Sequence, residues 1–367
     1  MGGAENQLLK IIEQLRDKKV QITILSKQTH NDPIKEQIFK DKVIKRLSVT
    51  NMPIISMIIF MVTLFFELVK LNKKQKIDLI HLPLPDAYII SVYLFSKIYK
   101  IPVITRVAAD ELYPYKKEGV WLLNRLLVRH FMLKLNGIQI LNPLAKNHAK
   151  KLGYPEERTF LIPNGTKIPE RHRNYGEFTH NILYIGAMRF YPEKNKMEQK
   201  NLLFLIETFY ELSKINKKLT LLMIGDGNYR TTLEDKVNKL GLRERVIFTG
   251  YQNNVYNYHL KADIFVNPSH WEGMPNTVIE AMSSGLIVFC SDIPEHRFLI
   301  KSNQNGILFD NKNKQDLIKK ISSFYTNFEK YEDIGINARD YIKNNLSIEK
   351  TIESIFNMYS NYFQNKL

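Results

Sequence analysis

The chain has 367 residues, of which 44% are hydrophobic and 25% are charged, as is typical of a soluble globular protein. These fractions exclude a disordered, collagen-like or disulfide-stapled class, and at roughly 150 residues per domain the length predicts two domains. Lys and Arg number 53 against 37 Asp and Glu, and almost all of the excess precedes residue 168, where 27 basic residues face 14 acidic ones.

Strand-length apolar runs alternate with helical patterns along the chain, which is typical of an α/β protein with parallel sheets. In the first half, helices are expected at 5–15, 54–69, 87–99 and 119–135. Strands are expected at 20–25, 77–81, 103–106, 138–141 and 159–162.

The expected helix at 54–69 is almost entirely apolar, but its 16 residues fall short of the roughly 20 that cross a bilayer. Basic residues flank it, from Lys40 to Arg46 and from Lys70 to Lys76. Such a helix can dock on an anionic leaflet or cover a sheet as a core helix, and both interpretations stay open. The positive excess of the first half favours an anionic partner, and a solubilising lysine-rich surface is the alternative.

A polar segment at 168–180 predicts a linker, after which the pattern restarts. Strands are expected at 181–186, 219–225, 246–250, 263–267 and 287–290, and helices at 201–214, at 229–240, from about 276 and over most of 313–364. Two doubly wound halves predict a cleft at the carboxyl ends of their strands, where such sheets bind ligands.

The segment from Glu272 to Glu280 is the first candidate site. A helix that begins just after Pro275 leaves backbone N–H groups free to bind an anion. Glu280, one turn further on, can reach the hydroxyls of a ribose, and Glu272 can accept hydrogen bonds from a second polyol. Two carboxylates that complement the helix dipole are the alternative interpretation.

Arg189 and Lys200 flank the loop that follows the strand at 181–186. Two cations at the carboxyl end of a strand can neutralise a diphosphate and stabilise its departure. Lys194 is the alternative to Lys200. A weaker signal is Gly2-Gly3 ahead of the first helix, where the backbone can approach a phosphate closely.

Other features limit the possible chemistry and location. The lone Cys290 allows no intrachain disulfide and lies in an apolar run, so a buried structural thiol in a reducing compartment is expected. We expect no secretory signal, and therefore a cytoplasmic protein. Nucleic-acid binding is not expected, because no recognition motif accompanies the basic residues.

Ordered motifs along nearly the whole chain resemble those of family 4 glycosyltransferases. They are Gly2-Gly3-Ala4-Glu5-Asn6-Gln7-Leu8-Leu9, Ile162-Pro163-Asn164-Gly165, Gly186 with Arg189 and Lys200-Asn201, Ile224-Gly225-Asp226-Gly227, Val246-Ile247-Phe248-Thr249-Gly250, Asn267-Pro268-Ser269, and Glu272-x7-Glu280-Ala281-Met282. The resemblance implies a GT-B fold, in which two Rossmann-like, doubly wound domains face each other across a cleft. An acceptor domain would span 1–167, a linker 168–180, a donor domain 181–345, and 346–367 would form a helix that crosses back to the first domain.

The resemblance also implies the activity, a metal-independent transfer of a sugar from a nucleotide diphosphate sugar with retention of anomeric configuration. Arg189 and Lys200 would bind the donor diphosphate, Glu280 the ribose and Glu272 the donor sugar. Gly3, Gly186, Gly273 and the backbone of Asn276, Thr277 and Val278 would complete the donor site. No cofactor or metal is expected, and consistently the chain has no Asp-x-Asp pair of the kind that holds Mg²⁺.

The chain departs from the family pattern in the first domain. Met1 directly precedes the Gly-Gly loop, so the family's first strand is missing, and a late recorded start, a substitute element and a decaying copy are the alternatives. Arg106 follows the strand where many relatives carry an acceptor-side His. It can bind an anionic acceptor or pair with Asp110 or Glu111.

Gly2, His81 and Arg106 are therefore the acceptor-side candidates, although a lone His such as His81 is more often structural. The Asp that many relatives carry shortly after Asn164-Gly165 is absent, and the long insertion before Lys200 is expected to form a flap.

The leading hypothesis is a membrane-associated glycosyltransferase, peripheral on the inner face of the cell membrane. It would add a sugar to a lipid-linked acceptor or to a growing surface polysaccharide such as lipopolysaccharide or capsule. A transferase to a soluble or protein acceptor, and a non-catalytic glycan- or nucleotide-binding protein, are the alternatives. Loop residues select nucleotide, sugar and acceptor, so the sequence names none of them.

Overall fold

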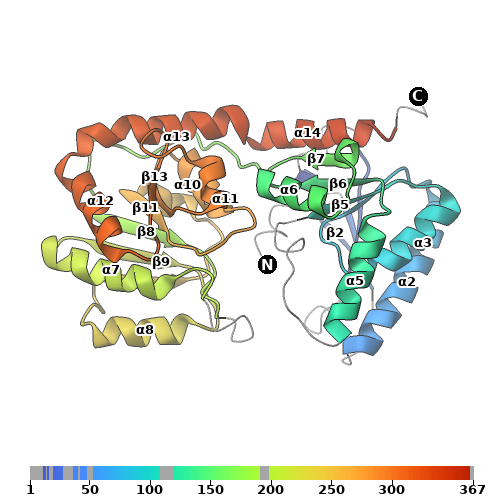
Figure 1. Ribbon diagram of the computed structural model, residues 1–367, viewed down its shortest axis with the longest axis horizontal. Helices are drawn as coiled ribbons and strands as arrows, with labels where there is room; N and C mark the ends of the chain where they lie inside the picture. The colour runs from blue at the N-terminus through green and yellow to red at the C-terminus, as the bar shows by residue number, and fades with distance from the viewer. Residues whose placement is uncertain are drawn as a thin grey trace. The chain divides into compact units, whose positions relative to one another are not determined.

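The computed structural model describes residues 11–13, 15, 20–27, 36–39, 42–47, 53–107, 120–190 and 198–363 (Figure 1). The chain divides into two compact units. The first comprises Met1–Pro163 together with Thr351–Leu367, and the second comprises Asn164–Lys350.

The described strands of the first unit form two sheets rather than one. A parallel sheet has the order β4-β5-β6-β7, with β4 (Ile80–Leu82), β5 (Val103–Val107), β6 (Gly137–Ile140) and β7 (Thr159–Leu161). The second sheet has the order β1-β3-β2, with β1 (Thr23–Lys27), β2 (Glu36–Phe39) and β3 (Lys42–Leu47). The antiparallel pair β2 and β3 was not expected, because its segments are short and rich in charge.

The α-helices of the first unit with described bounds are α2 (Pro53–Lys74), α3 (Ile89–Tyr99), α5 (Val120–Met132), α6 (Pro143–Lys151) and α14 (Ile348–Ser360), which begins at the boundary between the units. Residues 11–13 and 15, within the helix expected at 5–15, are also helical. Helix α6 was not predicted, although Asn142 is a good N-cap: its side chain accepts a hydrogen bond from the N–H of Ala145, and Pro143 follows it. Buried Phe95, Val103 and Ile138 lie in the core between helices and parallel sheet. Each such buried side chain contributes on the order of 2 kcal/mol.

The apolar helix α2 is longer than predicted. It has 22 residues, because its last turns extend through the lysines that follow the apolar run. The stretch Ile55–Lys74 is long and apolar enough to cross a membrane by length and composition, so the argument that the helix is too short was wrong. Only 17% of that stretch is buried, which also excludes a fully enclosed core helix.

The second unit has one six-stranded parallel sheet with the order β10-β9-β8-β11-β12-β13. Its strands are β8 (Asn181–Ile185), β9 (Thr220–Ile224), β10 (Val246–Gly250), β11 (Ile264–Asn267), β12 (Ile287–Ser291) and β13 (Ile307–Phe309). In chain order within the unit this is 3-2-1-4-5-6, the doubly wound arrangement that the sequence predicted. The adjacent strands β8 and β11 are the first and the fourth, so the winding direction reverses between them.

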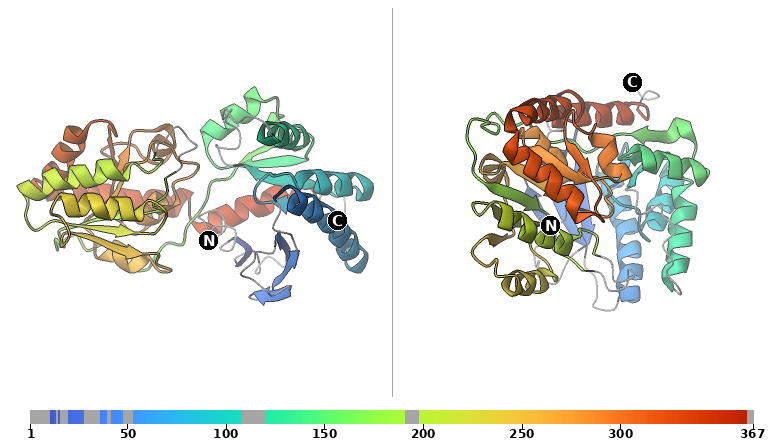
Figure 2. Two further views of the ribbon diagram at one scale, coloured as in Figure 1. Left: turned by 90° about the horizontal axis from the view of Figure 1, so that it is seen from below. Right: turned by 60° about the vertical axis from the view of Figure 1, so that its left-hand side comes forward.

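Helices cover this sheet. They are α7 (Leu202–Ile215), α8 (Arg230–Lys239), α9 (Tyr256–Leu260), α10 (Asn276–Ser283), α11 (Pro294–Leu299), α12 (Lys314–Thr326) and α13 (Glu332–Asn345). α7 packs against α8 and α12, and α10 packs against α13 (Figures 1 and 2). Cys290 is fully buried in β12, as expected of a structural thiol, and burial raises the pKa of its thiol well above the usual value.

The segment expected to be a linker, 168–180, has no helix or strand but is firmly attached to the second unit. Arg173 is 2% exposed, and its Nη2 lies 2.6 Å from Oδ1 of buried Asp263. Thr179 donates to the same carboxylate oxygen through its backbone N–H and its hydroxyl. Removing one partner of such a buried pair would leave an uncompensated charge, which costs about 3–5 kcal/mol.

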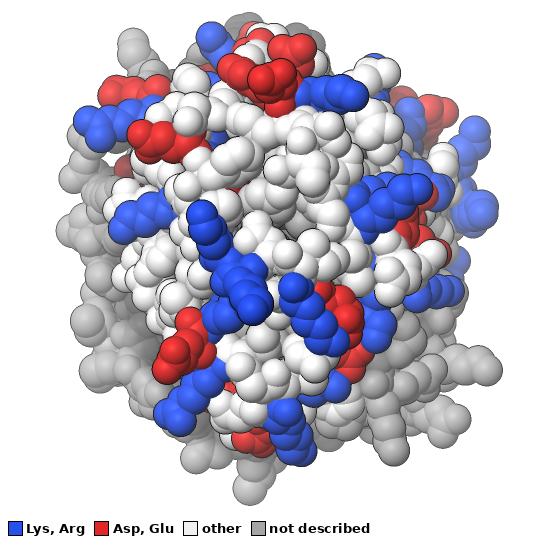
Figure 3. Space-filling model, turned by 90° about the vertical axis from the view of Figure 1, so that its left-hand side faces the viewer, with Lys and Arg blue, Asp and Glu red and all other residues white. Residues whose placement is uncertain are grey.

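Basic and acidic side chains both occur on the face of the second unit shown in Figure 3, scattered among uncharged ones. This mixture agrees with the near balance of 26 basic and 23 acidic residues after Lys167. Most of the positive excess therefore lies in the first unit.

Candidate active site

Two loops meet at the point where the winding direction reverses. The chain leaves β8 at Gly186 and leaves β11 at Pro268, and the two strands are neighbours in the sheet. Because both strands are parallel, both loops lie at the same carboxyl edge. The backbone N–H of His270 donates to the carbonyl of Gln199 at 2.8 Å, and the Gln199 side-chain amide donates to the carbonyl of Trp271 at 3.1 Å. The two loops are thus directly connected.

The turn after β8 depends on glycines from the next strand. The N–H of Gly186 donates to the carbonyl of Ile224, and that of Met188 to the carbonyl of Asp226, each at 3.0 Å. A Cβ at Gly225 would lie 2.0 Å from the carbonyl oxygen of Gly186, and its φ is +130°. A Cβ at Gly227 would lie 2.1 Å from the Met188 carbonyl oxygen. Only glycine fits at either position, which gives a physical reason for the Ile224-Gly225-Asp226-Gly227 motif.

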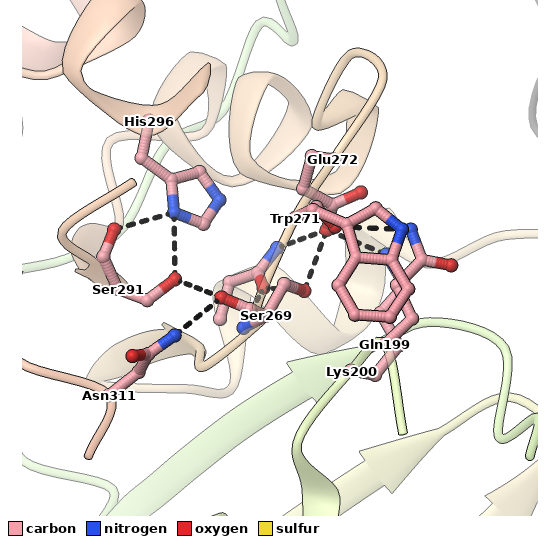
Figure 4. A network of polar contacts seen from close by, with 9 residues as sticks. Gln199, Lys200, Ser269, Trp271, Glu272, Ser291, His296 and Asn311 are labelled. Carbon is pink, nitrogen blue, oxygen red and sulfur yellow. Dashed lines mark hydrogen bonds and ion pairs between the residues drawn. The ribbon is translucent and has the colours of Figure 1, made fainter. Parts of the chain in front are cut away.

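Glu272 is the central acidic group of the site (Figure 4). It is 5% exposed, and its Oε1 accepts hydrogen bonds from Lys200 Nζ at 2.6 Å and Ser269 Oγ at 2.8 Å. Asn267 Nδ2 adds a third at 3.3 Å. The three donors come from the loop before α7 and from the end of β11, so the carboxylate is fixed by two separate segments.

All of these hydrogen bonds fall on one oxygen of Glu272. Within the described part of the chain, no hydrogen bond is made to Oε2. A carboxylate oxygen has lone pairs for two hydrogen bonds, so Oε2 is available to accept from hydroxyl groups of a ligand. Lys200 makes one side-chain hydrogen bond to the described residues, so two of its three ammonium protons have no acceptor among them and can be donated to an anion.

The surroundings hold Glu272 in its charged form. Burial acts to raise its pKa, but the charge of Lys200 and the hydrogen bonds from Lys200 and Ser269 outweigh burial and lower the pKa below the usual value. Next to it, burial lowers the pKa of His296 to about 4 despite the charge of Glu272, so this imidazole is neutral at physiological pH. His296 Nδ1 lies 2.8 Å from the carbonyl of Ser291, which assigns the ring proton to Nδ1.

Further hydrogen bonds hold Ser269 on its side away from Glu272 (Figure 4). Its carbonyl accepts from the Ser291 hydroxyl and, at 3.0 Å, from Asn311 Nδ2. Its hydroxyl lies 2.6 Å from Asn267 Oδ1. The residue that orients Glu272 is therefore tied to β12 and to the loop after β13.

Glu198 caps helix α7 directly before Lys200. Its carboxylate accepts from the N–H of Leu202 at 2.6 Å and from that of Leu203 at 3.4 Å. Burial nevertheless raises the pKa of Glu198 to about 7, against the lowering effect of these hydrogen bonds. The first amides of α7 are already capped by a side chain of the protein itself, so Lys200, and not these amides, is the group offered to a ligand here.

Arg189 is exposed, and no described carboxylate pairs with it. Its backbone belongs to the glycine turn after β8, as the sequence predicted. Lys194, the alternative diphosphate lysine, and the expected flap before Lys200 lie largely outside the described residues.

The N-terminus of α10 offers fewer free amides than expected. The N–H of Asn276 donates to the carbonyl of Met274 and that of Val278 to the carbonyl of Pro275. Of the three predicted phosphate-binding amides, that of Thr277 is the one without a partner among the described groups. The side chain of Asn276 accepts from buried Asn164 at 2.8 Å, which connects α10 to the Ile162-Pro163-Asn164-Gly165 motif.

The remaining predicted donor residues are only partly described. Gly273 and Glu280 are both half-buried, Gly273 in the loop before α10 and Glu280 on the helix itself, and each interacts within the chain. Gly2 and Gly3 lie outside the described residues.

The predicted acceptor-side residues lie in the first unit. His81 is half-buried on β4, and its Nδ1 lies 2.6 Å from the hydroxyl of Tyr359 on α14. Burial and the nearby Arg106 lower the pKa of His81 to about 4, so its ring is neutral. Arg106 is buried on β5, and its acceptor role, like that of His81, stays a prediction.

Glu198 and His296 were not predicted as site residues, and Ser269 was named only as part of the Asn267-Pro268-Ser269 motif, without a role. Ser269 carried a signal, since it follows a strand and lies three residues before Glu272. His296 carried none, because it reaches the site from α11 through the fold. No group of three or more His, Cys, Asp or Glu side chains that could hold a metal ion occurs in the described ranges.

Doubly wound sheets of this strand order bind nucleotides at the reversal point. Two α/β units with parallel sheets are the architecture of the GT-B fold. Solved structures agree: sucrose-phosphate synthase from Thermosynechococcus elongatus matches with a TM-score of 0.81 at 17% identity, covering 100% of this chain and 94% of that one. Anabaena HepE in complex with UDP-glucose matches with a TM-score of 0.78 at 17% identity, covering 98% and 96%.

The sequence comparisons give the family. The family model for glycosyltransferase family 4 matches residues 1–168, and that for glycosyl transferases group 1 matches residues 193–341. Together they cover most of the chain, which is a family 4 glycosyltransferase.

Characterised and uncharacterised relatives both match. A UDP-Gal:alpha-D-GlcNAc-diphosphoundecaprenol alpha-1,3-galactosyltransferase of Escherichia coli is 26% identical over 82% of this chain and 79% of its own length. An uncharacterised glycosyltransferase of Methanocaldococcus jannaschii is 29% identical over 62% of this chain. That match spans 58% of the archaeal protein's length.

Proposed function

We propose that the protein transfers a sugar from a nucleotide diphosphate sugar to a lipid-linked or growing surface-polysaccharide acceptor, with retention of anomeric configuration. The observation that carries this proposal is Glu272, which Lys200 and Ser269 hold in its charged form while no described residue donates a hydrogen bond to its Oε2. A fixed carboxylate oxygen beside an ammonium group suits a ligand in which sugar hydroxyls adjoin a diphosphate.

In the proposed donor complex, Arg189 and Lys200 bind the diphosphate and Glu272 Oε2 accepts a hydrogen bond from the donor sugar. Glu280, one turn into α10, binds the ribose. Gly186 and the N–H of Thr277 allow the phosphates to approach the backbone closely. Two cations already balance the diphosphate, so we propose that the reaction needs no metal ion and no cofactor.

The proposed reaction breaks the bond between the anomeric carbon and the diphosphate oxygen, while the acceptor hydroxyl attacks from the same face of the sugar. The acceptor proton passes to the departing diphosphate, so no side chain has to gain or lose a proton. Negative charge grows on the diphosphate as the sugar becomes oxocarbenium-like, and Arg189 and Lys200 stabilise that charge. A preorganised donor of this kind contributes about 10²–10³-fold to the rate.

The acceptor class rests on two observations. The Escherichia coli relative acts, by its name, on a sugar attached to diphosphoundecaprenol. The first unit carries the positive excess, which suits an acceptor with a lipid diphosphate and a peripheral position on the cytoplasmic face of the membrane.

The test begins with a panel of nucleotide diphosphate sugars and measures thermal stabilisation and release of nucleotide diphosphate without acceptor. One donor should stabilise the protein, by about 2.7 kcal/mol at 100 times its dissociation constant. The same donor should be consumed faster when a polyprenyl-diphosphate-linked sugar is added. If no nucleotide sugar binds or turns over, the proposal is wrong.

A further inference from the structure

Helix α2 presents an apolar stripe to the surface of the first unit. Ile55, Ile58, Val62 and Phe66 are exposed, and Phe66 is 66% exposed. At 100° per residue these positions lie on one side of the helix. The buried residues of α2, among them Leu64 and Leu68, lie on the opposite side and join the core. The helix is therefore apolar on both sides, and on one of them these side chains are exposed rather than packed against described residues.

Helix α3 extends this stripe. It packs against α2 and exposes Leu94 and Ile98. Between the two helices runs a groove of about 360 Å³, lined from Phe66 on α2 to Leu94 on α3, in which Ser91 is the one polar residue. We call the exposed apolar residues of α2 and α3, together with this groove, the α2–α3 face. Contiguous apolar surface of this kind marks an interaction site.

One end of the α2–α3 face is strongly basic. Six exposed lysines, and no acidic residue, occur in the segments 70–76 and 97–100 at the ends of the two helices. α2 leads into β4 and α3 into β5, and these strands are parallel neighbours, so both basic helix ends lie at the same edge of the sheet. The lysines are Lys70, Lys73, Lys74, Lys76, Lys97 and Lys100.

This combination identifies the partner. We propose that the α2–α3 face docks on an anionic lipid bilayer, with Phe66 and its neighbours in the acyl boundary and the lysines at the headgroups. The exposed lysines require a partner surface of negative charge, and the apolar stripe requires one that also offers an apolar interior. Anionic headgroups above an acyl layer offer both, and each nearby lysine contributes on the order of a fivefold gain in binding.

The geometry indicates that α2 lies along the membrane surface and does not cross it. Leu64 and Leu68 pack against the core around Phe95, and a crossing helix would have to leave that core. An apolar stripe on one side with basic residues at the end is typical of helices in the interfacial plane. The inference deepens the membrane position of the proposed function but uses none of the donor-site residues.

The test is co-flotation of the full-length protein with vesicles of phosphatidylcholine alone or with 30% phosphatidylglycerol added. The wild type should float with the anionic vesicles at low salt and lose most of that binding at high salt. Phe66→Glu should weaken flotation at least tenfold. The matched control is Ile215→Glu, which changes an equally exposed apolar residue of the second unit, 66% exposed, and should bind like the wild type.

A second pair of variants tests the charges. Lys73→Glu/Lys74→Glu should weaken binding at least tenfold, and Lys217→Glu/Lys218→Glu, an exposed pair of the second unit, should not. Equal flotation of all variants, or no flotation of the wild type, would overturn the proposal. A dimer that light scattering detects and that Phe66→Glu dissociates would also overturn it.

Donor hydrolysis without vesicles separates membrane docking from the proposed sugar transfer, and it should be unchanged in all four variants. A wild type that floats but does not hydrolyse any donor would refute the sugar transfer and leave the docking proposal intact.

Discussion

The ion pair between Lys200 and Glu272 has a structural role and a proposed catalytic role, and variants of the two residues can separate them. We consider Lys200→Met, Glu272→Gln and the double variant. The side chains of Lys200 and Glu272 are 19% and 7% exposed and 2.6 Å apart. Lys200→Met leaves a nearly buried carboxylate without its cation, which should cost about 3 kcal/mol, the lower end of the range for broken buried pairs. In a unit of this size that lowers the Tm by roughly 6–12 °C.

The double variant should recover most of that loss, because a neutral amide beside an apolar chain needs no counter-charge. Calorimetry of the four proteins at pH 7 gives the coupling free energy, which should exceed about 1 kcal/mol. Donor hydrolysis should stay at least about 100-fold below wild type in the double variant despite its recovered stability. Additive stability effects would refute the buried pair, and recovered hydrolysis would refute the catalytic assignment.

Four further predictions follow from the same geometry. The pKa of Glu198 is raised to about 7 in the folded state, so between pH 4.5 and 7 this carboxyl group binds more protons in the folded protein than in the unfolded chain. The free energy of unfolding of the wild type should therefore fall by up to about 3 kcal/mol as the pH rises from 4.5 to 7. Glu198→Gln should abolish that part of the pH dependence, and an identical pH profile would exclude the buried cap. Gly225→Ala should lower the Tm well below that of Gly241→Ala, which shares a positive φ but has no atom within 4 Å of its Cβ position; equal Tm values would contradict the tight contact with Gly186. Arg189→Ala should raise the KM for the donor about 10–100-fold at unchanged Tm, and an unchanged KM would exclude its diphosphate contact. Excess EDTA should leave the transfer rate unchanged, and a loss restored by Mg²⁺ would show that a metal is needed.

Most of the second unit could be predicted because its signals are local, but the last strand β13 and the short helices α9 and α11 were missed. Each strand of its sheet is a short apolar run with a helix or turn after it, and the glycines at 225 and 227 mark the tight turn. The resemblance then named Arg189, Lys200 and Glu272, and the structure brings Lys200 and Glu272 into contact across 72 residues of sequence.

The features that were not predicted have two causes. Some depend on contacts made only in the folded chain, and in others charged residues hide the apolar pattern of a helix or strand. His296 and Asn311 reach Ser269 only through the folded sheet. Helix α2 continues through Lys70 to Lys74 because lysine is a good helix former, so the apolar run understated its length. The strands β2 and β3 pair although both contain charged residues, and these charges made the two segments look like part of a basic, irregular stretch.

The most direct test of the proposed function follows the anomeric proton by NMR while the protein acts on an α-configured nucleotide sugar and a lipid-diphosphate-linked acceptor. The product should show an α linkage, formed at a rate that falls at least about 100-fold in Glu272→Gln. A β-linked product, or a rate that does not depend on Glu272, would contradict a retaining transferase built around this carboxylate.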